Sequence, residues 1–262
     1  MTSLGEVASY LDDYLRVREV PDEANAVNGL QVENAGSVAR IVAAVDASLE
    51  TIVGSGRERA GAGPDAGPGL LLVHHGLFWD GNVPLTGRRF RRVRALLECD
   101  TALYSAHIPL DVHPEVGNNV VLAARLGMRV AGWFGAYRDI SIGVWGDAPQ
   151  TLSDRDSLVR RLGEVLGADP RLIPGGPAAV RRVGIVTGAA GSMIAAARDA
   201  GLDTFITGEG PHHTYFDAME WGVNVIYAGH YATEQVGVQA LAAHLAERFG
   251  LPWEFHHHPT GL

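Results

Sequence analysis

The chain has 262 residues, of which 47% are hydrophobic and 19% are charged. This composition is ordinary for a globular protein, and the length suffices for one large domain or two modest ones with ample core. The formal net charge of −9 argues against bulk nucleic-acid binding through a diffuse basic face. No apolar run approaches the ~20 residues that a membrane-spanning helix needs.

The only cysteine, Cys99, excludes an internal disulfide framework and any zinc site built from cysteines. Residues 1–20 carry acidic and basic side chains throughout, so we expect no signal peptide. These features predict a cytoplasmic protein that does not enter a membrane.

The first third of the chain alternates between helical and extended patterns. Residues 7–20 have the apolar spacing of a helix that ends at Pro21. The sequence NGLQV, residues 28–32, reads as a turn that leads into an extended segment. Residues 39–45 predict a strand, and Ser48 is placed to cap the helix that follows.

Two adjacent histidines follow the next predicted strand. Residues 70–73 are four apolar residues that predict a short buried strand, and His74 and His75 come directly after it, before Gly76. Successive strand residues face opposite ways, so we expect both imidazoles to serve one cleft only where the strand has ended. Histidine is the commonest metal ligand, which makes this pair the first candidate site.

Further strands alternate with helices along the rest of the chain. The predicted strands lie at 101–106, 183–187, 204–207 and 223–228, and helices are expected near 114–126 and 158–166. This alternation predicts an α/β fold with a largely parallel sheet. Ligands of such sheets bind beyond the carboxyl ends of the strands, and His74, His107 and His230 all occupy that position.

The two halves of the chain are similar. LYSAH, which ends at His107, aligns with IYAGH, which ends at His230, and at the same offset Asp111 falls on Glu234. Each copy therefore has a histidine at a strand end and an acid four residues later. We predict an internal duplication with one unit at 1–131 and the other at 132–262, both of which contribute ligands to one site.

The candidate side chains are imidazoles and carboxylates without a thiolate. Such a set suits Zn, Mn, Fe or Co, because Ca²⁺ and Mg²⁺ prefer shells made only of oxygen. A carboxylate that bridges two ions relieves their repulsion, and a pair of ions activates water for hydrolysis. The pattern thus indicates hydrolytic chemistry at a two-ion centre.

Four motifs resemble those of the GTP cyclohydrolase type 2 family, also described as NIF-three-like dinuclear-metal hexamers. They are NGLQV, HHGLFW, SAHIPLDVHPEVGNN and GHYATEQVGVQAL, and they keep the family's order from about Tyr10 to Phe255. The resemblance implies two similar α/β/α units, assembled as a homohexamer with a dinuclear centre in each subunit. The family name suggests GTP ring opening as one reaction of such a centre.

The resemblance assigns roles to individual residues. His75 and Asp111 would hold one divalent ion, His74 and His230 the other, and Glu234 would bridge them. His107 would support the ligands or transfer protons together with Glu234, although a purely structural histidine in the strand–loop corner fits equally well. His213 aligns with a histidine that many members carry and is a candidate for lining the pocket, whereas Pro211 stands where many members have Lys.

Other polar clusters have weaker claims to a role. The arginine run from Arg88 to Arg94 could contact a substrate phosphate, although a solvated helix face or an intersubunit salt-bridge set is favoured about two to one. His256 to His258 resemble a short metal-binding tract but are kept out of the site. GAAG at 188–191 lacks the rest of a dinucleotide or phosphate-loop fingerprint.

The sequence therefore predicts a metal-dependent hydrolase that acts on a nucleotide-like or other small polar substrate. Two other classes remain open: a regulatory or interaction protein with structural metals, and a metal-storage protein without turnover.

Overall fold

The computed structural model describes residues 2–61 and 67–261. The chain divides into two compact units. The first comprises 1–110 and 238–258, and the second comprises 111–237 and 259–262. The predicted boundary at 131/132 differs from this division, in which the chain leaves the first unit after residue 110 and returns to it at residues 238–258.

The first unit contains a sheet of strand order β13-β4-β5-β6-β2 among the described residues. Its strands are β2 (Gly29–Val32), β4 (Arg40–Asp46), β5 (Gly69–His75), β6 (Thr101–Ser105) and β13 (Trp253–Phe255). Neighbours pair in parallel except β2, which runs antiparallel to β6. A small antiparallel pair joins β1 (Thr2–Ser3) and β3 (Ser37–Val38).

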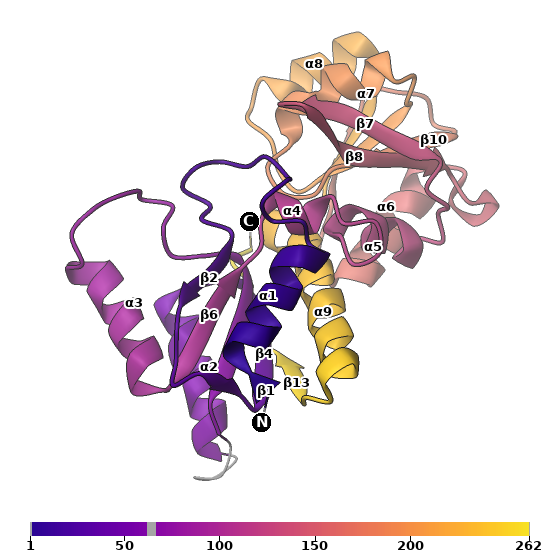
Figure 1. The fold of residues 1–262 in the computed structure, drawn as a ribbon. Coiled ribbons are helices and arrows are strands. Elements are labelled where there is room, and N and C mark those ends of the chain that lie inside the picture. Colours follow the sequence, from indigo (N-terminus) through magenta and orange to yellow (C-terminus); the bar gives the residue numbers. More distant parts are fainter. Residues whose placement is uncertain (1, 62–66, 262) are drawn as a thin grey trace. The chain divides into compact units, whose positions relative to one another are not determined.

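Helices cover both faces of this sheet (Figure 1). On one side α2 (Leu49–Gly61) and α3 (Gly87–Glu98) lie next to each other. On the other, α1 (Leu4–Tyr14) contacts the C-terminal part of α9 (His230–Phe249), where Tyr10 Oη and His244 Nε2 are 2.5 Å apart. Ser48 caps α2 as predicted, because its hydroxyl accepts a bond from the Thr51 amide at 3.0 Å.

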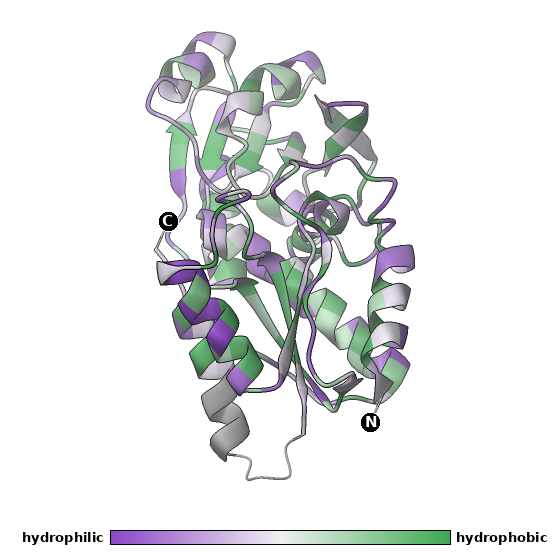
Figure 2. Ribbon diagram, turned by 60° about the vertical axis from the view of Figure 1, so that its left-hand side comes forward, coloured by the Kyte–Doolittle hydropathy of each residue, from purple (hydrophilic) through white to green (hydrophobic). Residues whose placement is uncertain are grey.

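The central strands of this sheet are apolar along their whole length because both faces are covered. Residues 41–45 of β4 and 70–74 of β5 are all buried, and the hydropathy colouring shows the same concentration of apolar residues in the strands (Figure 2). Leu71, Val73 and Leu103 pack into one apolar cluster with α2 and α3. The buried run that predicted this strand therefore marks the centre of the sheet.

The second unit contains a sheet of strand order β7-β8-β10-β11-β12-β9. Its strands are β7 (Gly132–Tyr137), β8 (Ile140–Asp147), β9 (Arg171–Pro174), β10 (Arg182–Ile185), β11 (Thr204–Thr207) and β12 (Asn224–Tyr227). Its helical segments are α4 (Ile108–Asp111, begun in the first unit), α5 (Asn118–Arg125), η1 (Gln150–Leu152), α6 (Arg155–Leu166), η2 (Gly191–Met193), α7 (Ile194–Asp199) and α8 (Thr214–Trp221).

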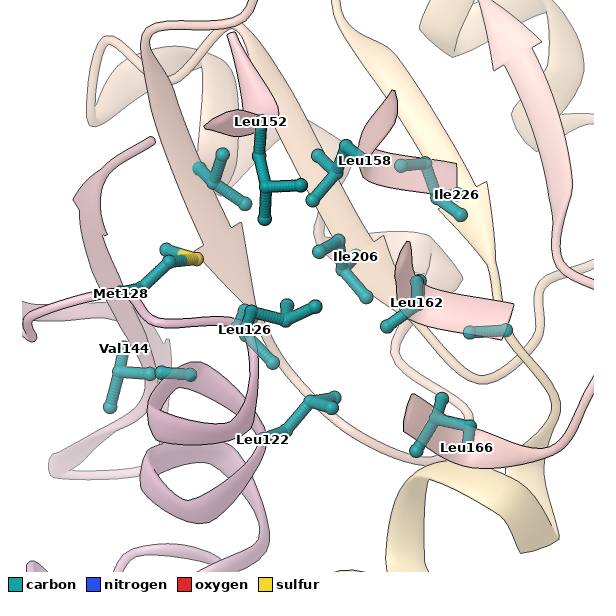
Figure 3. Packing of buried hydrophobic residues seen from close by; sticks show 14 of the residues in the cluster. Leu122, Leu126, Met128, Val144, Leu152, Leu158, Leu162, Leu166, Ile206 and Ile226 are labelled. Atoms are coloured by element: carbon teal, nitrogen blue, oxygen red, sulfur yellow. The ribbon is translucent and has the colours of Figure 1, made fainter. Parts of the chain in front are cut away.

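Leucines of α5 and α6 pack against the second sheet (Figure 3). Leu122, Leu158 and Leu162 are fully buried and belong to one apolar cluster with Ile206 and Ile226 of the central strands. The helix α6 is closed at both ends, by Asp154 accepting from the Ser157 amide and by a left-handed Gly167. Because α7 and α8 lie together and α7 contacts β7 and β11, this unit also has helices on both sides.

The two sheets share a strand order, which supports the predicted duplication. In the first unit β4, β5 and β6 are parallel neighbours, followed by the antiparallel β2. In the second unit β10, β11 and β12 are parallel neighbours, followed by the antiparallel β9. The α/β fold class and the two similar α/β/α units are thus confirmed.

Two predicted elements differ in extent, and one hairpin was not predicted. The first helix ends at Tyr14 rather than near residue 20, since Arg16 adopts a left-handed φ of 53°. The strand β5 continues through both histidines to His75, which pairs with Asp46. The β7–β8 hairpin was not predicted; its turn contains Arg138, also with a φ of 53°.

No helix among the described residues is both long and apolar enough to cross a membrane.

Candidate metal centre

Three imidazoles gather at the carboxyl ends of β5 and β6 in the first unit. His74 and His75 end β5, and His107 follows the neighbouring parallel strand β6. The ring centroid of His74 lies 4.7 Å from that of His75 and 5.0 Å from that of His107. One possible ligand atom from each residue lies within 4.8 Å of the other two. We refer to these three residues as the imidazole cluster.

The strand does not need to end before the histidines for both to reach this cluster. His74 is fully buried and His75 is partly exposed, as the alternation of a strand requires. The two ring centroids are nevertheless only 4.7 Å apart, with an angle of 51° between the ring planes. The expectation that the backbone turns before His74 was therefore wrong, and the convergence occurs at the last residues of β5.

Each imidazole of the cluster has its Nδ1 atom beside an oxygen. The pairs are His74 with the Ala106 carbonyl at 2.8 Å, His75 with Asp46 Oδ1 at 2.9 Å and His107 with Asp22 Oδ1 at 2.8 Å. A carbonyl or a carboxylate oxygen accepts, so the imidazole donates from Nδ1. In the neutral ring this leaves Nε2 with its lone pair. Metal-binding histidines characteristically donate their other ring N–H to such oxygens.

The NGLQV motif and Asp22 together hold His107. The Asn28 amide donates to Asp22 Oδ2 at 2.7 Å, and its oxygen accepts the His107 backbone N–H at 2.7 Å. The Ile108 amide also donates to Asp22 at 3.0 Å. Burial alone would raise the pKa of Asp22, but the bonds and charge of His107, with the Asn28 and Glu23 donors, lower it below 3.8.

Gln31 of the same motif holds the backbone just beyond the histidine pair. Its amide nitrogen donates to the carbonyls of Ala26 and Val27 at 3.0 and 2.9 Å, and its oxygen accepts the Leu77 N–H at 2.8 Å. A Cβ on Gly76 would overlap this amide group. The glycine after the two histidines is thus required by the close approach of Gln31.

In the second unit, His230 lies between two carboxylates at the start of α9. Its Nδ1 is 2.8 Å from Glu209 Oε1, and its Nε2 is 3.1 Å from Glu234 Oε2. His230 and Glu234 are four residues apart and share a helix face. Burial opposes the imidazolium, yet the hydrogen bonds and charges of Glu234 and Glu209 raise the pKa of His230 to about 9.

Asp111 is held by buried polar groups of the same unit. Asn118 Nδ2 donates to Asp111 Oδ1 at 2.8 Å, and the Thr187 hydroxyl contacts that oxygen at 3.4 Å. Gly188, next along the chain, has a φ of +72° and leaves no room for a Cβ beside the Glu234 carboxylate. The turn after β10 therefore supports both acids. Asn118 and Asn119 support this region from the start of α5, since Asn119 also donates to the Asp111 carbonyl at 3.3 Å.

The remaining candidates lie outside these clusters. His213 is exposed at the start of α8, and His258 forms an ion pair of 2.9 Å with Glu50. Within α3 the arginines have different surroundings: Arg89 is buried, whereas Arg94 is exposed and pairs with Glu98 at 2.7 Å. The predicted solvated face of this helix thus includes one arginine that turns inward.

Comparison with known proteins places the chain in a family. The family model described as Duf34/NIF3 (NGG1p interacting factor 3) matches residues 2–260. The chain belongs to this family. Proteins named "GTP cyclohydrolase 1 type 2 homolog" are 44% identical in Deinococcus radiodurans, over 98% of this chain and 94% of that protein, and 42% identical in Pyrococcus abyssi, over 98% of each.

Solved structures share the Duf34/NIF3 fold over the whole chain. TTHA1606 from Thermus thermophilus is 40% identical with a TM-score of 0.87, and the alignment covers 100% of both chains. Protein ybgI, described as of unknown function, is 35% identical with the same TM-score of 0.87 and the same coverage. HcgD from Methanocaldococcus jannaschii, at 22% identity and a TM-score of 0.79, shares the fold.

The oxygen partners of the imidazoles were not predicted from the sequence. Asp46 is the last residue of β4, and Glu209 follows β11, so both lie at carboxyl ends of parallel strands where the histidines also lie. That position could have identified them. Asp22 follows Pro21 in an irregular segment and carries no comparable signal.

Proposed function

We propose that this protein is a dinuclear-metal-dependent hydrolase that acts on a nucleotide-like or other small polar substrate. The observation that supports this most is the shared arrangement of the imidazole cluster, in which every Nδ1 faces an oxygen acceptor. This arrangement prepares the Nε2 atoms for a metal ion. Histidines with a purely structural role would not be expected to cluster in this way with an oxygen acceptor beside every Nδ1 atom.

The proposed ligands are those that the family resemblance assigns. His75 and Asp111 would hold one ion, His74 and His230 the other, and Glu234 would bridge the two. The donor chemistry fits, because imidazole and carboxylate without thiolate suit Zn, Mn, Fe or Co. The geometry within each unit supports the assignment separately, since His74 of the first unit and Asp111 of the second are each held by a buried hydrogen bond.

A bound pair of ions would lower the pKa of a water molecule and polarise a substrate bond. The residues around these ions would transfer protons or orient the metal ligands. Asp22 fixes the orientation of His107, so that this imidazole is available for proton transfer. Glu234 is the second candidate for moving protons, because its Oε2 atom lies 3.1 Å from Nε2 of His230. Asp46 and Glu209 orient His75 and His230.

The substrate class rests on the relatives named GTP cyclohydrolase 1 type 2 homolog. The test is to load the protein with Zn²⁺, Mn²⁺, Fe²⁺ or Co²⁺ and incubate it with GTP, other nucleotides, phosphoesters and cyclic amides. Formate and a ring-opened product from GTP would establish the cyclohydrolase reaction. Turnover of another compound would retain the hydrolase and replace the substrate, whereas metal uptake without turnover of any compound would contradict the hydrolase.

An interaction role is the second candidate, because the matching family is described as an interacting factor. If the metals only stabilise a binding surface, Glu234→Ala would lose partner or self-association with no turnover to lose. A metal-storage protein would instead exchange its ions rapidly and reversibly without hydrolysis. The substrate panel and a metal-exchange measurement on the same preparation separate these three functions.

We also propose a homohexamer in the cytoplasm, on the strength of the family resemblance and of a sequence with one cysteine. Light scattering coupled to size-exclusion chromatography tests the assembly. A mass of six chains is expected, and a monomer at micromolar concentration would contradict it.

A further inference from the structure

The loop that follows the histidine pair, residues 76–86, is held by one buried arginine. Arg89 of α3 donates from Nη1 to the Val83 carbonyl at 3.1 Å and from Nη2 to the Gly81 carbonyl at 2.7 Å. It also pairs with Asp80, and its guanidinium lies 5.2 Å from the Phe78 ring centroid. A planar guanidinium with several N–H donors suits this task, which a lysine could not perform.

This loop carries Trp79 to the edge of the imidazole cluster. The indole centroid lies 4.9 Å from that of His107 and 5.9 Å from that of His75, with the planes at 80° and 76°. Asn25 also fixes the residue, because its amide donates to the Trp79 carbonyl at 3.3 Å. The indole is therefore the aromatic neighbour of two of the three histidines.

The Trp79 N–H has a further property. Its Nε1 atom is buried, and among the residues that the structure describes it has no hydrogen-bond acceptor. An indole N–H is only a donor, and leaving such a group buried without an acceptor costs about 1–3 kcal/mol. Buried polar groups without a partner are few in native proteins, and each calls for an explanation such as a catalytic role or a bound water or ion.

We propose that Trp79 is a ligand-contacting residue of the imidazole cluster, whose N–H donates to an oxygen of the bound substrate. The ligand chemistry is a phosphate, carboxylate or carbonyl oxygen held next to the metal ligands. Arg89 is the positioning residue for this contact, because it fixes the loop on which Trp79 lies. This inference rests on the proposed metal function and names a substrate contact for it.

The test uses the full-length protein loaded with Co²⁺ and inorganic phosphate as the oxyanion probe. Co²⁺ affinity is measured first, and phosphate binding is then followed by calorimetry and by the visible spectrum of the bound Co²⁺. The variants are Trp79→Phe, which retains an aromatic ring but removes the N–H, Arg89→Met, and the double variant. Trp221→Phe and Arg94→Met are the controls, because Trp221 lies on α8 and Arg94 is exposed.

Trp79→Phe is expected to bind Co²⁺ like the wild type and to bind phosphate roughly 10- to 150-fold more weakly, the loss typical of one hydrogen bond to a charged group. Arg89→Met should weaken phosphate binding to a similar extent, and the double variant should be no worse than either single variant. This non-additivity would show that Arg89 acts through Trp79, which a merely structural role would not produce. If Arg89→Met does not fold, Asp80→Asn serves in its place, because it is a milder change in the exposed ion-pair partner of Arg89. It should reproduce part of the loss of phosphate binding.

Several outcomes overturn the inference. Phosphate binding by Trp79→Phe that equals the wild type removes the hydrogen bond, and additive losses in the double variant remove the positioning role. A wild-type protein that binds Co²⁺ but not phosphate contradicts the oxyanion contact and leaves the metal centre intact. A protein that takes up no Co²⁺ contradicts the proposed function itself, and the inference falls with it.

Discussion

The Nδ1 atom of His107 lies 2.8 Å from Oδ1 of Asp22, a residue 85 positions earlier in the chain. The Asp22 side chain is only 6% exposed and also receives bonds from Asn28 and from the Ile108 backbone. One carboxylate thus fixes both the ring and the backbone at the end of β6. His107, to which the family resemblance gives no ligand role, is thus held at both its ring and its backbone.

This relationship makes the stability of the protein depend on pH. The folded-state pKa of Asp22 lies below its ordinary value of 3.8. As the pH falls, Asp22 is therefore protonated in the unfolded state before it is protonated in the folded state. Its contribution to the free energy of unfolding is complete above the ordinary pKa of 3.8 and is lost as the pH falls through the folded-state pKa. Urea unfolding between pH 6 and pH 2 should show a shallower acid decline for Asp22→Asn than for the wild type.

The control for this experiment is Asp13→Asn, since Asp13 is exposed on α1. Its acid decline should parallel that of the wild type. If Asp22→Asn loses free energy of unfolding with falling pH as steeply as the wild type, the carboxylate is not held by His107 as described.

Asp46 should act on metal binding through His75. Asp46→Asn keeps the shape of the side chain but removes the charge that faces His75 Nδ1 at 2.9 Å. Removing such an outer partner typically costs about 10–100-fold in metal affinity, and we expect a loss in this range for Co²⁺ measured by competition with a chelator. Asp139→Asn, in the exposed β7–β8 turn, should leave the affinity unchanged.

Gly76→Ala should destabilise the first unit. The added methyl group would overlap the Gln31 amide, which bonds to the Ala26 and Val27 carbonyls and to the Leu77 N–H. Overpacking of this kind costs about 1–3 kcal/mol in the free energy of unfolding, measured by urea denaturation. The double variant with Gln31→Ala should lose less than the sum of the two single changes, and strict additivity would contradict the clash.

Gly188→Ala should weaken metal binding through Glu234. Its φ of +72° is in the left-handed region, which costs roughly 1–2 kcal/mol for alanine, and the new Cβ would meet the Glu234 carboxylate. Gly167→Ala is a matched control, because its φ of +64° imposes the same strain but nothing lies within 4 Å of the added atom. Both variants should lose stability, and only Gly188→Ala should lose Co²⁺ affinity.

The positions of the histidines were predictable because they follow from the order of strands. Parallel strands present their carboxyl ends at one edge of a sheet, so His74, His75 and His107 could be expected at one edge once β5 and β6 were recognised. The shared strand order of the two sheets was predictable for a similar reason, since the duplicated motifs repeat in sequence.

The partners of these histidines could not be predicted in the same way. Asp22 reaches His107 from an irregular segment, and Arg89 turns inward from a helix whose other arginines gave no sign of the difference. Both contacts depend on tertiary packing and not on the spacing of apolar residues in the local sequence. The end of α1 was misjudged because apolar spacing continues past Tyr14, where the backbone instead turns at Arg16.

The most direct measurement is the number of divalent ions that the purified chain retains after reconstitution and gel filtration, determined by elemental analysis. Two ions per chain are expected for the wild type, with a loss of at least one in His75→Ala and in Glu234→Ala. A wild-type protein that retains none, at any pH between 6 and 8, would contradict the metal centre on which the proposed function depends.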